Sequence, residues 1–200
     1  MSSVMQRNLR VQRTYPKLKM HIVRLFRTPK SSPMYEENHR RASTLAVLLM
    51  TGCRPGRNRN ATKGGRTYGL TTLQASHVQT GSGVCTTLKY GGKKNVSQKH
   101  KVCDKQVSTW VRYAVRNKKR LFLSDAQLRS DPILASAGVR PKDIRTWKAN
   151  QIASQYRGSS KNEVLQKVSE ALGNTPSVCE KYYVAPEILS KGRVSRAQVK

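Results

Sequence analysis

An excess of basic side chains constrains this 200-residue chain more than any other feature. The chain has 39 lysines and arginines against 10 aspartates and glutamates, a formal net charge of +29. Charge this dense repels itself in a compact fold unless a polyanion neutralises it. The sequence therefore predicts a nucleic-acid-binding protein. An anionic membrane is the weaker alternative, because the longest apolar run, residues 45–50, is far too short to cross a bilayer.

The cysteines and the N-terminal residues indicate where such a chain works. Cys53, Cys85, Cys103 and Cys179 are widely separated and form neither a CxxC pair nor a Cys/His ligand spacing. We therefore expect four free thiols in a reducing compartment, without a zinc site or a disulfide framework. Residues 1–17 lack the apolar segment of a signal peptide. The expectation is an intracellular protein (of cytoplasm, nucleus, an organelle or a virion), not a secreted one.

The chain divides into three parts by composition. Residues 1–34 are basic, weakly periodic and interrupted by three prolines. They predict an N-terminal arm or linker that lies on phosphates and is partly disordered when free. Residues 35–190 hold the periodic segments and predict one folded domain. Residues 191–200 form a short basic tail.

Within the domain, the pattern predicts a helix, a small sheet and then further helices. Acidic residues at the start of segment 36–52 and a glycine at its end are typical of a helix. Short β-prone runs bounded by glycines follow at residues 70–73, 77–80, 84–90 and 95–103. Helices are expected over residues 104–119, 126–138 (with a break at Pro132), 141–158 and 160–173, and after Pro176. The predicted fold class is therefore α+β, mainly helical, with a small antiparallel sheet of three strands.

No cofactor or metal motif is evident. The chain has neither a P-loop nor a G-x-G-x-x-G segment, and its acidic residues are too few and scattered for a two-metal nuclease. We therefore expect no cofactor, no metal and no small-molecule substrate.

Five segments carry motifs in a definite order. They are TGCRPGRNR (51–59), YGLTTLQASHV (68–78), KYGGKKNVSQKH (89–100), PKDIRTW (141–147) and LGNTPSVCEKYYVAPEIL (172–189). They resemble the catalytic segments of type IB DNA topoisomerases of the poxviral and bacterial branch, and the resemblance spans roughly residues 36–190. Tyrosine recombinases share this fold, but their second arginine box usually reads His-x-x-Arg, whereas this chain has Lys142 in KDIR. The resemblance therefore favours a topoisomerase.

The resemblance implies which cations would act on DNA. Arg54 and Arg145 correspond to the family's two catalytic arginines, and Lys93 corresponds to the catalytic lysine of its β-hairpin. Arginine suits this role because its planar fork of donors matches a phosphate and stays charged. A lysine at the hairpin tip can protonate the leaving 5′ oxygen. Further expected DNA-binding residues are Arg59, Arg66, Lys94 and Lys142.

The resemblance also implies a tyrosine nucleophile. In most relatives the tyrosine lies nine residues after a histidine. Asn174 stands nine residues before Tyr183, whereas Gly173 stands nine before Tyr182 and could not serve. Tyr183 is therefore the expected nucleophile, and Tyr182, about 100° away around a helix, is expected to pack elsewhere. Asn174 can donate the hydrogen bond of the missing histidine, so we count it with the catalytic residues. Unlike histidine, it cannot titrate.

The activity implied is that of a monomeric type IB topoisomerase acting on duplex DNA. Such an enzyme relaxes supercoils by transient single-strand cleavage through a 3′-phosphotyrosyl intermediate, without ATP or metal. Two alternatives stay open: a tyrosine recombinase or integrase, and a non-catalytic nucleic-acid-binding subunit derived from this fold. Family members usually carry an N-terminal β domain that clamps DNA. Here a basic segment of some 35 residues precedes the catalytic part, and this segment substitutes for the clamp unless that domain lies elsewhere or has been lost.

Overall fold

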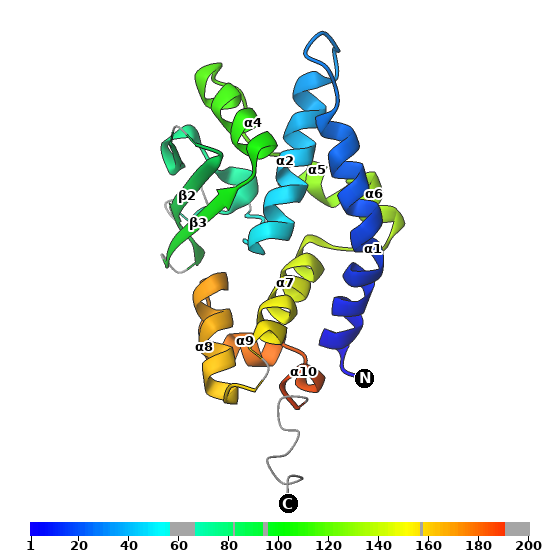
Figure 1. The fold of residues 1–200 in the computed structure, drawn as a ribbon, viewed down its shortest axis with the longest axis vertical. Coiled ribbons are helices and arrows are strands. Elements are labelled where there is room, and N and C mark those ends of the chain that lie inside the picture. Colours follow the sequence, from blue (N-terminus) through cyan, green and yellow to red (C-terminus); the bar gives the residue numbers. More distant parts are fainter. Residues whose placement is uncertain (57–66, 82, 94–95, 157, 191–200) are drawn as a thin grey trace, which may run out of the picture.

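The computed structural model describes residues 1–56, 67–81, 83–93, 96–156 and 158–190 (Figure 1). Its elements are α1 (Ser3–Phe26), α2 (Tyr35–Thr51), η1 (Leu70–Thr72), η2 (Ala75–His77), β1 (Val78–Thr80), β2 (Cys85–Gly91), β3 (Ser97–Cys103), α4 (Lys105–Arg116), α5 (Asp125–Arg129), α6 (Pro132–Ser136), α7 (Pro141–Gln155), α8 (Lys161–Leu172), α9 (Pro176–Tyr182) and α10 (Pro186–Ser190). Helices α2 and α4 and the sheet form the upper part of Figure 1, and α8, α9 and α10 gather around the end of α7 below. Helix α1 runs alongside both parts, and its N-terminus lies near α10. The predicted fold class, mainly helical with a three-stranded antiparallel sheet, is confirmed.

The N-terminal segment differs from the expected arm. Residues 3–26 form the longest described helix, α1, whose N-cap Ser2 accepts a hydrogen bond from the Met5 N–H. Val11 and Leu18 are fully buried, and α1 packs against both α2 and α7. The expectation of a partly disordered arm is therefore wrong for this segment. The apolar residues that α1 buries recur at helical spacing, but the basic residues between them obscure that period in the sequence.

Helix α2 is the centre of the larger hydrophobic core. It contacts α1, α4 and α7, and its apolar run around Leu45 and Leu48 is fully buried. Gly52 ends the helix in a left-handed conformation, with φ +61°, and a Cβ there would lie 3.0 Å from Leu172 and Lys148. A glycine is needed here because the conformation and the close approach both exclude a side chain. The chain then turns directly into Cys53 and Arg54.

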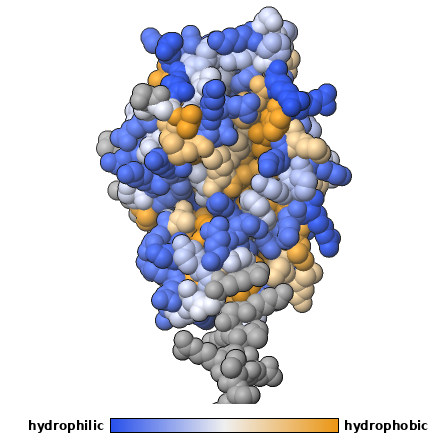
Figure 2. Space-filling view, viewed as in Figure 1, coloured by the Kyte–Doolittle hydropathy of each residue, from blue (hydrophilic) through white to orange (hydrophobic). Residues whose placement is uncertain are grey.

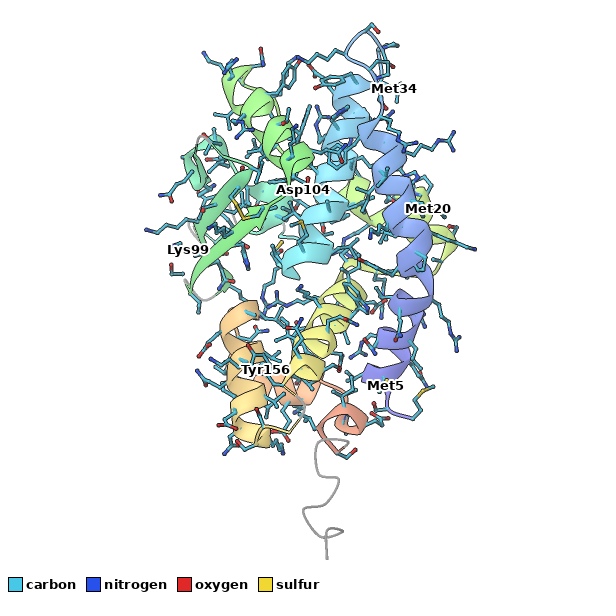
Figure 3. All side chains as sticks on the ribbon, in the orientation of Figure 1. Met5, Met20, Met34, Lys99, Asp104 and Tyr156 are labelled. Atoms are coloured by element: carbon cyan, nitrogen blue, oxygen red, sulfur yellow. A yellow bond between two sulfur atoms is a disulfide. The ribbon has the colours of Figure 1, made fainter. Side chains whose placement is uncertain are left out.

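The sheet has the order β1-β2-β3, with both pairs antiparallel. Residues 70–73 were expected to be a strand, but they form the short helix η1, because Thr72 and Leu73 bond back onto Gly69 and Leu70. The side chains of β3 alternate between the buried face and solvent, and Lys99 lies on the outer side of the sheet (Figure 3). His100 faces inward and is 8% exposed.

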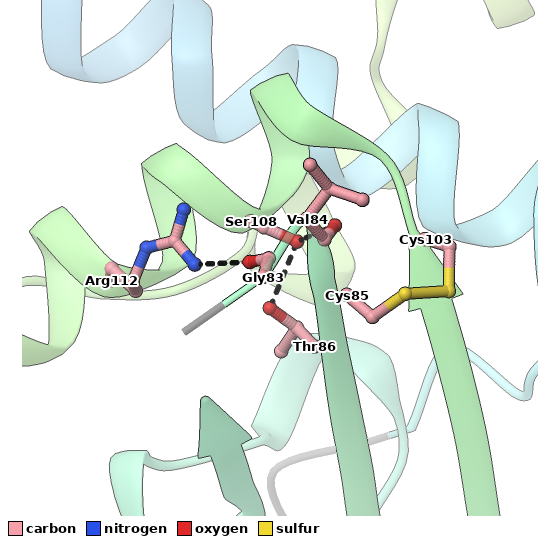
Figure 4. Close-up of a disulfide and its surroundings, with 7 residues drawn as sticks. All are labelled: Gly83, Val84, Cys85, Thr86, Cys103, Ser108 and Arg112. Carbon is pink, nitrogen blue, oxygen red and sulfur yellow. Dashed lines mark hydrogen bonds between the residues drawn. A yellow bond between two sulfur atoms is a disulfide. The ribbon is translucent and has the colours of Figure 1, made fainter. Parts of the chain in front are cut away.

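A disulfide joins Cys85 to Cys103 (Figure 4), so the expectation of four free thiols is wrong. The antiparallel register places these two residues directly opposite each other, with their Cα atoms 4.0 Å apart. Their separation of 18 residues does not reveal this register. Beside the disulfide, Ser108 of α4 donates to the Val84 carbonyl at 2.7 Å and ties the helix to the strand. Cys53 and Cys179 are free and buried.

The C-terminal helices begin where the sequence places their caps. Ser160 and Glu163 form the expected capping box of α8, and Thr175 caps α9. Pro132 separates α5 from α6 as expected, whereas α10 is an additional short helix. This part has its own small apolar cluster, which includes Tyr183 and Val184.

The outer surface is mixed in character. Hydrophilic side chains cover most of the face in Figure 2, and apolar side chains emerge between them. Within the described ranges, no helix combines the length and hydropathy required to span a membrane.

We predict that Leu18→Ala lowers the free energy of unfolding by about 2–5 kcal/mol, because it removes a fully buried side chain from the packing of α1. The measurement is urea denaturation followed by circular dichroism. The matched control is Met20→Ala on the outer side of the same helix (Figure 3), where Met20 is 67% exposed and a change within about 0.5 kcal/mol is expected. Equal stability of the two variants would mean that α1 is dispensable to the core.

Candidate active site

Most of the expected site residues surround one cleft. A cavity of about 460 Å³ is lined by residues from the end of α2, the turn between β2 and β3, the start of α7 and the end of α9. Among them are Arg54, Lys93, Lys142, Arg145 and Tyr183. Six of the described lining residues are cationic and none is acidic. The cleft is therefore suited to a polyanion.

Asn174 lies in an adjoining hollow. This second cavity has a volume of about 570 Å³ and shares Arg54, Lys93 and Tyr183 with the first. Tyr182 lines the hollow as well. The structure thus brings the five expected catalytic residues, together with Lys142, to one connected depression. The other expected DNA-binding residues, Arg59, Arg66 and Lys94, lie outside the described residues.

Arg145 is held by the ends of two helices. It is 2% exposed, and its Nη1 and Nη2 donate to the carbonyls of Gly52 and Leu172, each at 2.5 Å. These carbonyls lie at the C-terminal ends of α2 and α8, where helix carbonyls lack intrahelical partners and the helix dipole is negative. Burial lowers the pKa of Arg145, and neighbouring Tyr183 acts in the opposite direction. The result is a fixed cation among the residues that line the cleft.

Arg54 and Asn174 orient each other. Arg54 Nη2 donates to Asn174 Oδ1 at 2.6 Å. Since a guanidinium only donates, the amide oxygen of Asn174 must face the arginine and its NH₂ group must face away. That Nδ2 is buried and makes no hydrogen bond within the part of the chain that the structure describes. Burial raises the pKa of the Cys179 thiol and the Asn174 side chain acts in the opposite direction, so Asn174 lies beside both Arg54 and Cys179.

Helix η1 fixes the backbone around Arg54. The Leu70 N–H donates to the Arg54 carbonyl at 2.9 Å, and the Thr71 N–H donates to the Pro55 carbonyl at 2.7 Å. Gly69 makes this approach possible, because a Cβ there would lie 2.6–2.7 Å from the backbone of residues 54 and 56. The YGL segment of the sequence motif thus positions the first arginine.

Tyr183 lies against Arg145. It is 6% exposed, and its ring centre is 5.2 Å from the Arg145 guanidinium carbon. Tyr182 is 44% exposed, and its ring lies near the ammonium groups of Lys142 and Lys181. The two tyrosines therefore have different surroundings, as the helical spacing predicts. Tyr182 is exposed, however, and the expectation that it packs is wrong.

Asn150 holds the tyrosine segment and was missed in the sequence. Its Nδ2 donates to the Tyr183 carbonyl at 2.8 Å, and its Oδ1 accepts from the Ala185 N–H at 2.8 Å. Asn150 is 1% exposed on α7, the helix that also carries Arg145. One helix thus positions both an arginine and the tyrosine backbone. The sequence signal that could have revealed this role was an asparagine on the apolar face of the helix predicted over residues 141–158.

Gln98 joins the β2–β3 hairpin to the tyrosine segment. A Cβ on Gly92 would lie 2.8 Å from the Gln98 side chain, and one on Gly173 would overlap the same side chain. Gln98 therefore fills the space between the hairpin and the end of α8. Lys93, directly after Gly92, is exposed at the edge of the cleft.

Neutral groups lie beneath the arginines. Burial lowers the pKa of His100 to about 4, and Arg145 acts in the same direction. Burial raises the pKa of Cys53 to about 11 and that of Tyr90 well above its ordinary value. His100 Nε2 is buried without a hydrogen-bond partner among the described residues. These groups add no charge to the site at neutral pH. Across the described ranges, no group of three or more His, Cys, Asp or Glu residues could hold a metal ion.

Two solved structures of similar fold are complexes of a site-specific recombinase. The XerH post-cleavage complex with a palindromic difH substrate is 17% identical, with a TM-score of 0.54 over 84% of this chain and 47% of the XerH chain. The XerH pre-cleavage complex with a difH substrate is also 17% identical, with a TM-score of 0.55 over 90% of this chain and 52% of the other. The chain spans about half the length of these recombinases. The likeness shows a tyrosine-recombinase fold.

A family comparison identifies the chain more closely. The model of the family "Eukaryotic DNA topoisomerase I, catalytic core" matches residues 13–182. The chain belongs to this family, which confirms the expected membership of the topoisomerase IB and tyrosine recombinase superfamily. A comparison with curated proteins finds no match.

We predict that Arg145→Ala destabilises the protein, because two buried carbonyls lose their donor at a cost of about 1–3 kcal/mol each. Urea denaturation measures the change. The control is Arg54→Ala, which removes a half-buried arginine that donates a hydrogen bond to Asn174. This change should lower the free energy of unfolding by about 1 kcal/mol. If Arg145→Ala were as stable as the wild type, the two helix ends would not depend on this arginine.

We also predict a pH-dependent contribution to stability from His100. Its pKa in the folded protein, about 4, lies below the ordinary value of 6.5, so the unfolded chain binds the proton more tightly. The stabilisation is complete above pH 6.5 and is lost as the pH falls from 6.5 to 4, by about 3 kcal/mol at most. Unfolding curves of the wild type and His100→Gln should therefore converge or cross on acidification. If the free energies of unfolding of the two proteins changed in parallel with pH, the lowered pKa of His100 would be contradicted.

Proposed function

We propose that this protein is a type IB DNA topoisomerase, an enzyme that relaxes supercoiled duplex DNA by cutting and rejoining one strand. The observation that carries the proposal is the convergence of Arg54, Arg145, Lys93 and Tyr183 on one cleft free of described acidic side chains. Membership of the topoisomerase I catalytic-core family supports it. Duplex DNA as the partner is further supported by the similar XerH structures, in which the recombinase is bound to a difH substrate.

The reaction is a reversible transesterification. The Tyr183 phenol oxygen attacks the phosphorus and its proton passes to water, while the bond from phosphorus to the 5′ oxygen breaks. Lys93 protonates the leaving 5′ oxygen. The DNA is then joined through its 3′ phosphate to Tyr183, and attack by the 5′ hydroxyl reverses both steps. Because one phosphate ester replaces another, no ATP is required.

The arginines supply the charge that this step needs. A phenol is a weak nucleophile at neutral pH, so the step needs positive charge beside the attacking oxygen and the phosphate. Arg145 is fixed by two helix ends before DNA arrives, so little reorganisation is needed when charge develops on the phosphoryl oxygens. Each such donor contributes about 3–4 kcal/mol by analogy with oxyanion holes.

Asn174 takes the place of the family's histidine as a hydrogen-bond donor. Its oxygen is bound to Arg54, and its buried Nδ2 lacks a hydrogen-bond partner among the described residues. In the proposed complex, this N–H donates to a non-bridging phosphate oxygen. The group cannot titrate, so it stabilises charge and transfers no proton.

We predict that Tyr183→Phe abolishes plasmid relaxation, because it removes the attacking oxygen and leaves the ring packed. Relaxation of a negatively supercoiled plasmid is measured with EDTA and without ATP, and the covalent DNA adduct is detected by gel electrophoresis under denaturing conditions. The matched control is Tyr182→Phe, which is expected to retain both relaxation and the adduct.

Three results would count against the proposal. Relaxation that survives Tyr183→Phe but not Tyr182→Phe would assign the nucleophile to the other tyrosine. A wild-type protein that binds duplex DNA but forms no adduct would indicate a binding subunit. An adduct confined to one DNA sequence, without plasmid relaxation, would indicate a recombinase.

A further inference from the structure

A second basic groove lies between α1 and α6. It has a volume of about 560 Å³ and is separate in its lining from the candidate active site. Arg10, Arg13 and Lys17 line one side of it, at positions that share one face of α1. Ile133 and Ser136 belong to the opposite side, on α6. None of the described residues that line the groove is acidic.

Two of the three cations of this groove form no ion pair with the described residues. Arg13 and Lys17 are exposed, and neither forms an ion pair with another described residue. Arg10 is anchored, because it donates to the Gly138 carbonyl at 3.0 Å and lies 3.8 Å from Asp143. Three cations on one helix face repel one another, so a polyanionic partner would stabilise this surface.

The groove and the active-site cleft meet at Asp143. This buried carboxylate lies between Arg10 of the groove and Arg140 of the cleft rim, at 3.8 and 3.5 Å, and Arg7 of α1 lies 3.9 Å away. Three arginines around a single carboxylate leave a surplus of positive charge. Arg129, on α5 next to α6, lines the cleft as well. Basic side chains therefore continue from the cleft, across the start of α7, to α1.

We propose that this α1–α6 groove binds the backbone of the same duplex DNA beyond the cleaved phosphate. The proposal rests on the proposed function for its substrate. Arg10 and Lys17 are seven residues apart, about 10 Å along the helix. A DNA strand offers a phosphate about every 3.4 Å along its axis. Three cations over this length match the backbone of about three base pairs.

The structure favours duplex DNA over other polyanions because Arg10 of the groove and Arg140 of the cleft lie on either side of one carboxylate, Asp143, so basic side chains link the two sites. Contacts to phosphates alone carry no sequence preference, so the groove adds affinity and orientation. An acidic protein would require no such link to the cleft. A groove that serves another partner would leave binding to duplex DNA unchanged when its cations are removed.

The test is the salt dependence of binding to a linear duplex, measured by fluorescence anisotropy. It uses the Tyr183→Phe protein, so that no covalent adduct contributes. Adding Arg13→Gln and Lys17→Gln should reduce the slope of log Kd against log salt by about two units, since each phosphate contact contributes about 0.9. A hydroxyl-radical footprint should also shorten by about three base pairs on one side.

The matched control is Lys19→Gln with Lys105→Gln, which removes the same charge from two exposed positions outside the groove. It should reduce the slope by less than half a unit. All variants should unfold within about 0.5 kcal/mol of the parent, because the changed side chains are exposed. An unchanged slope in the groove variant, or an equal reduction in the control, overturns the proposal. The readout is binding and not cleavage, so a wild-type protein that forms no adduct would refute the proposed function and leave this test of the groove valid.

Discussion

The bonds from Arg145 to the carbonyls of Gly52 and Leu172 hold the architecture of the cleft together. They join the ends of α2 and α8, which belong to the two separate hydrophobic clusters of the protein. A buried charge is costly unless it is well bonded, and two helix C-termini supply suitable acceptors. One residue thus meets a structural need and presents positive charge to the cleft. Tyr183 packs on the same guanidinium. The position of the tyrosine is therefore set by the arginine that joins the ends of α2 and α8.

Much of this arrangement could be predicted from the sequence. The caps at Ser160 and Thr175 and the glycine at position 52 are local signals, and each marks a helix boundary in the structure. The residues around the cleft were identified from five short motifs, which occur along the chain in the same order as in the family that it resembles. Their convergence is visible only in the folded chain, since Arg54 lies in the segment after α2 and Arg145 lies on α7.

The features that were missed depend on contacts between distant segments. Helix α1 is stabilised by packing on α2 and α7, so its basic composition says little about its order. The disulfide depends on strand register, and the burial of His100 depends on which face of β3 the fold covers. Asn150 is a polar residue whose partners, the backbone of Tyr183 and Ala185, lie more than 30 positions away. Local patterns carry no information of this kind.

The packing of Tyr183 against its own Arg145 also bears on how the proposed nucleophile is supplied. The tyrosine segment is tied to α7 through Asn150, and Arg7 of α1 donates to the Tyr182 carbonyl. The proposed attacking group and the proposed phosphate ligands thus come from a single polypeptide, which is a cis arrangement. A second copy is not needed to deliver the tyrosine, and swapping this segment between subunits would first require these tethers to break.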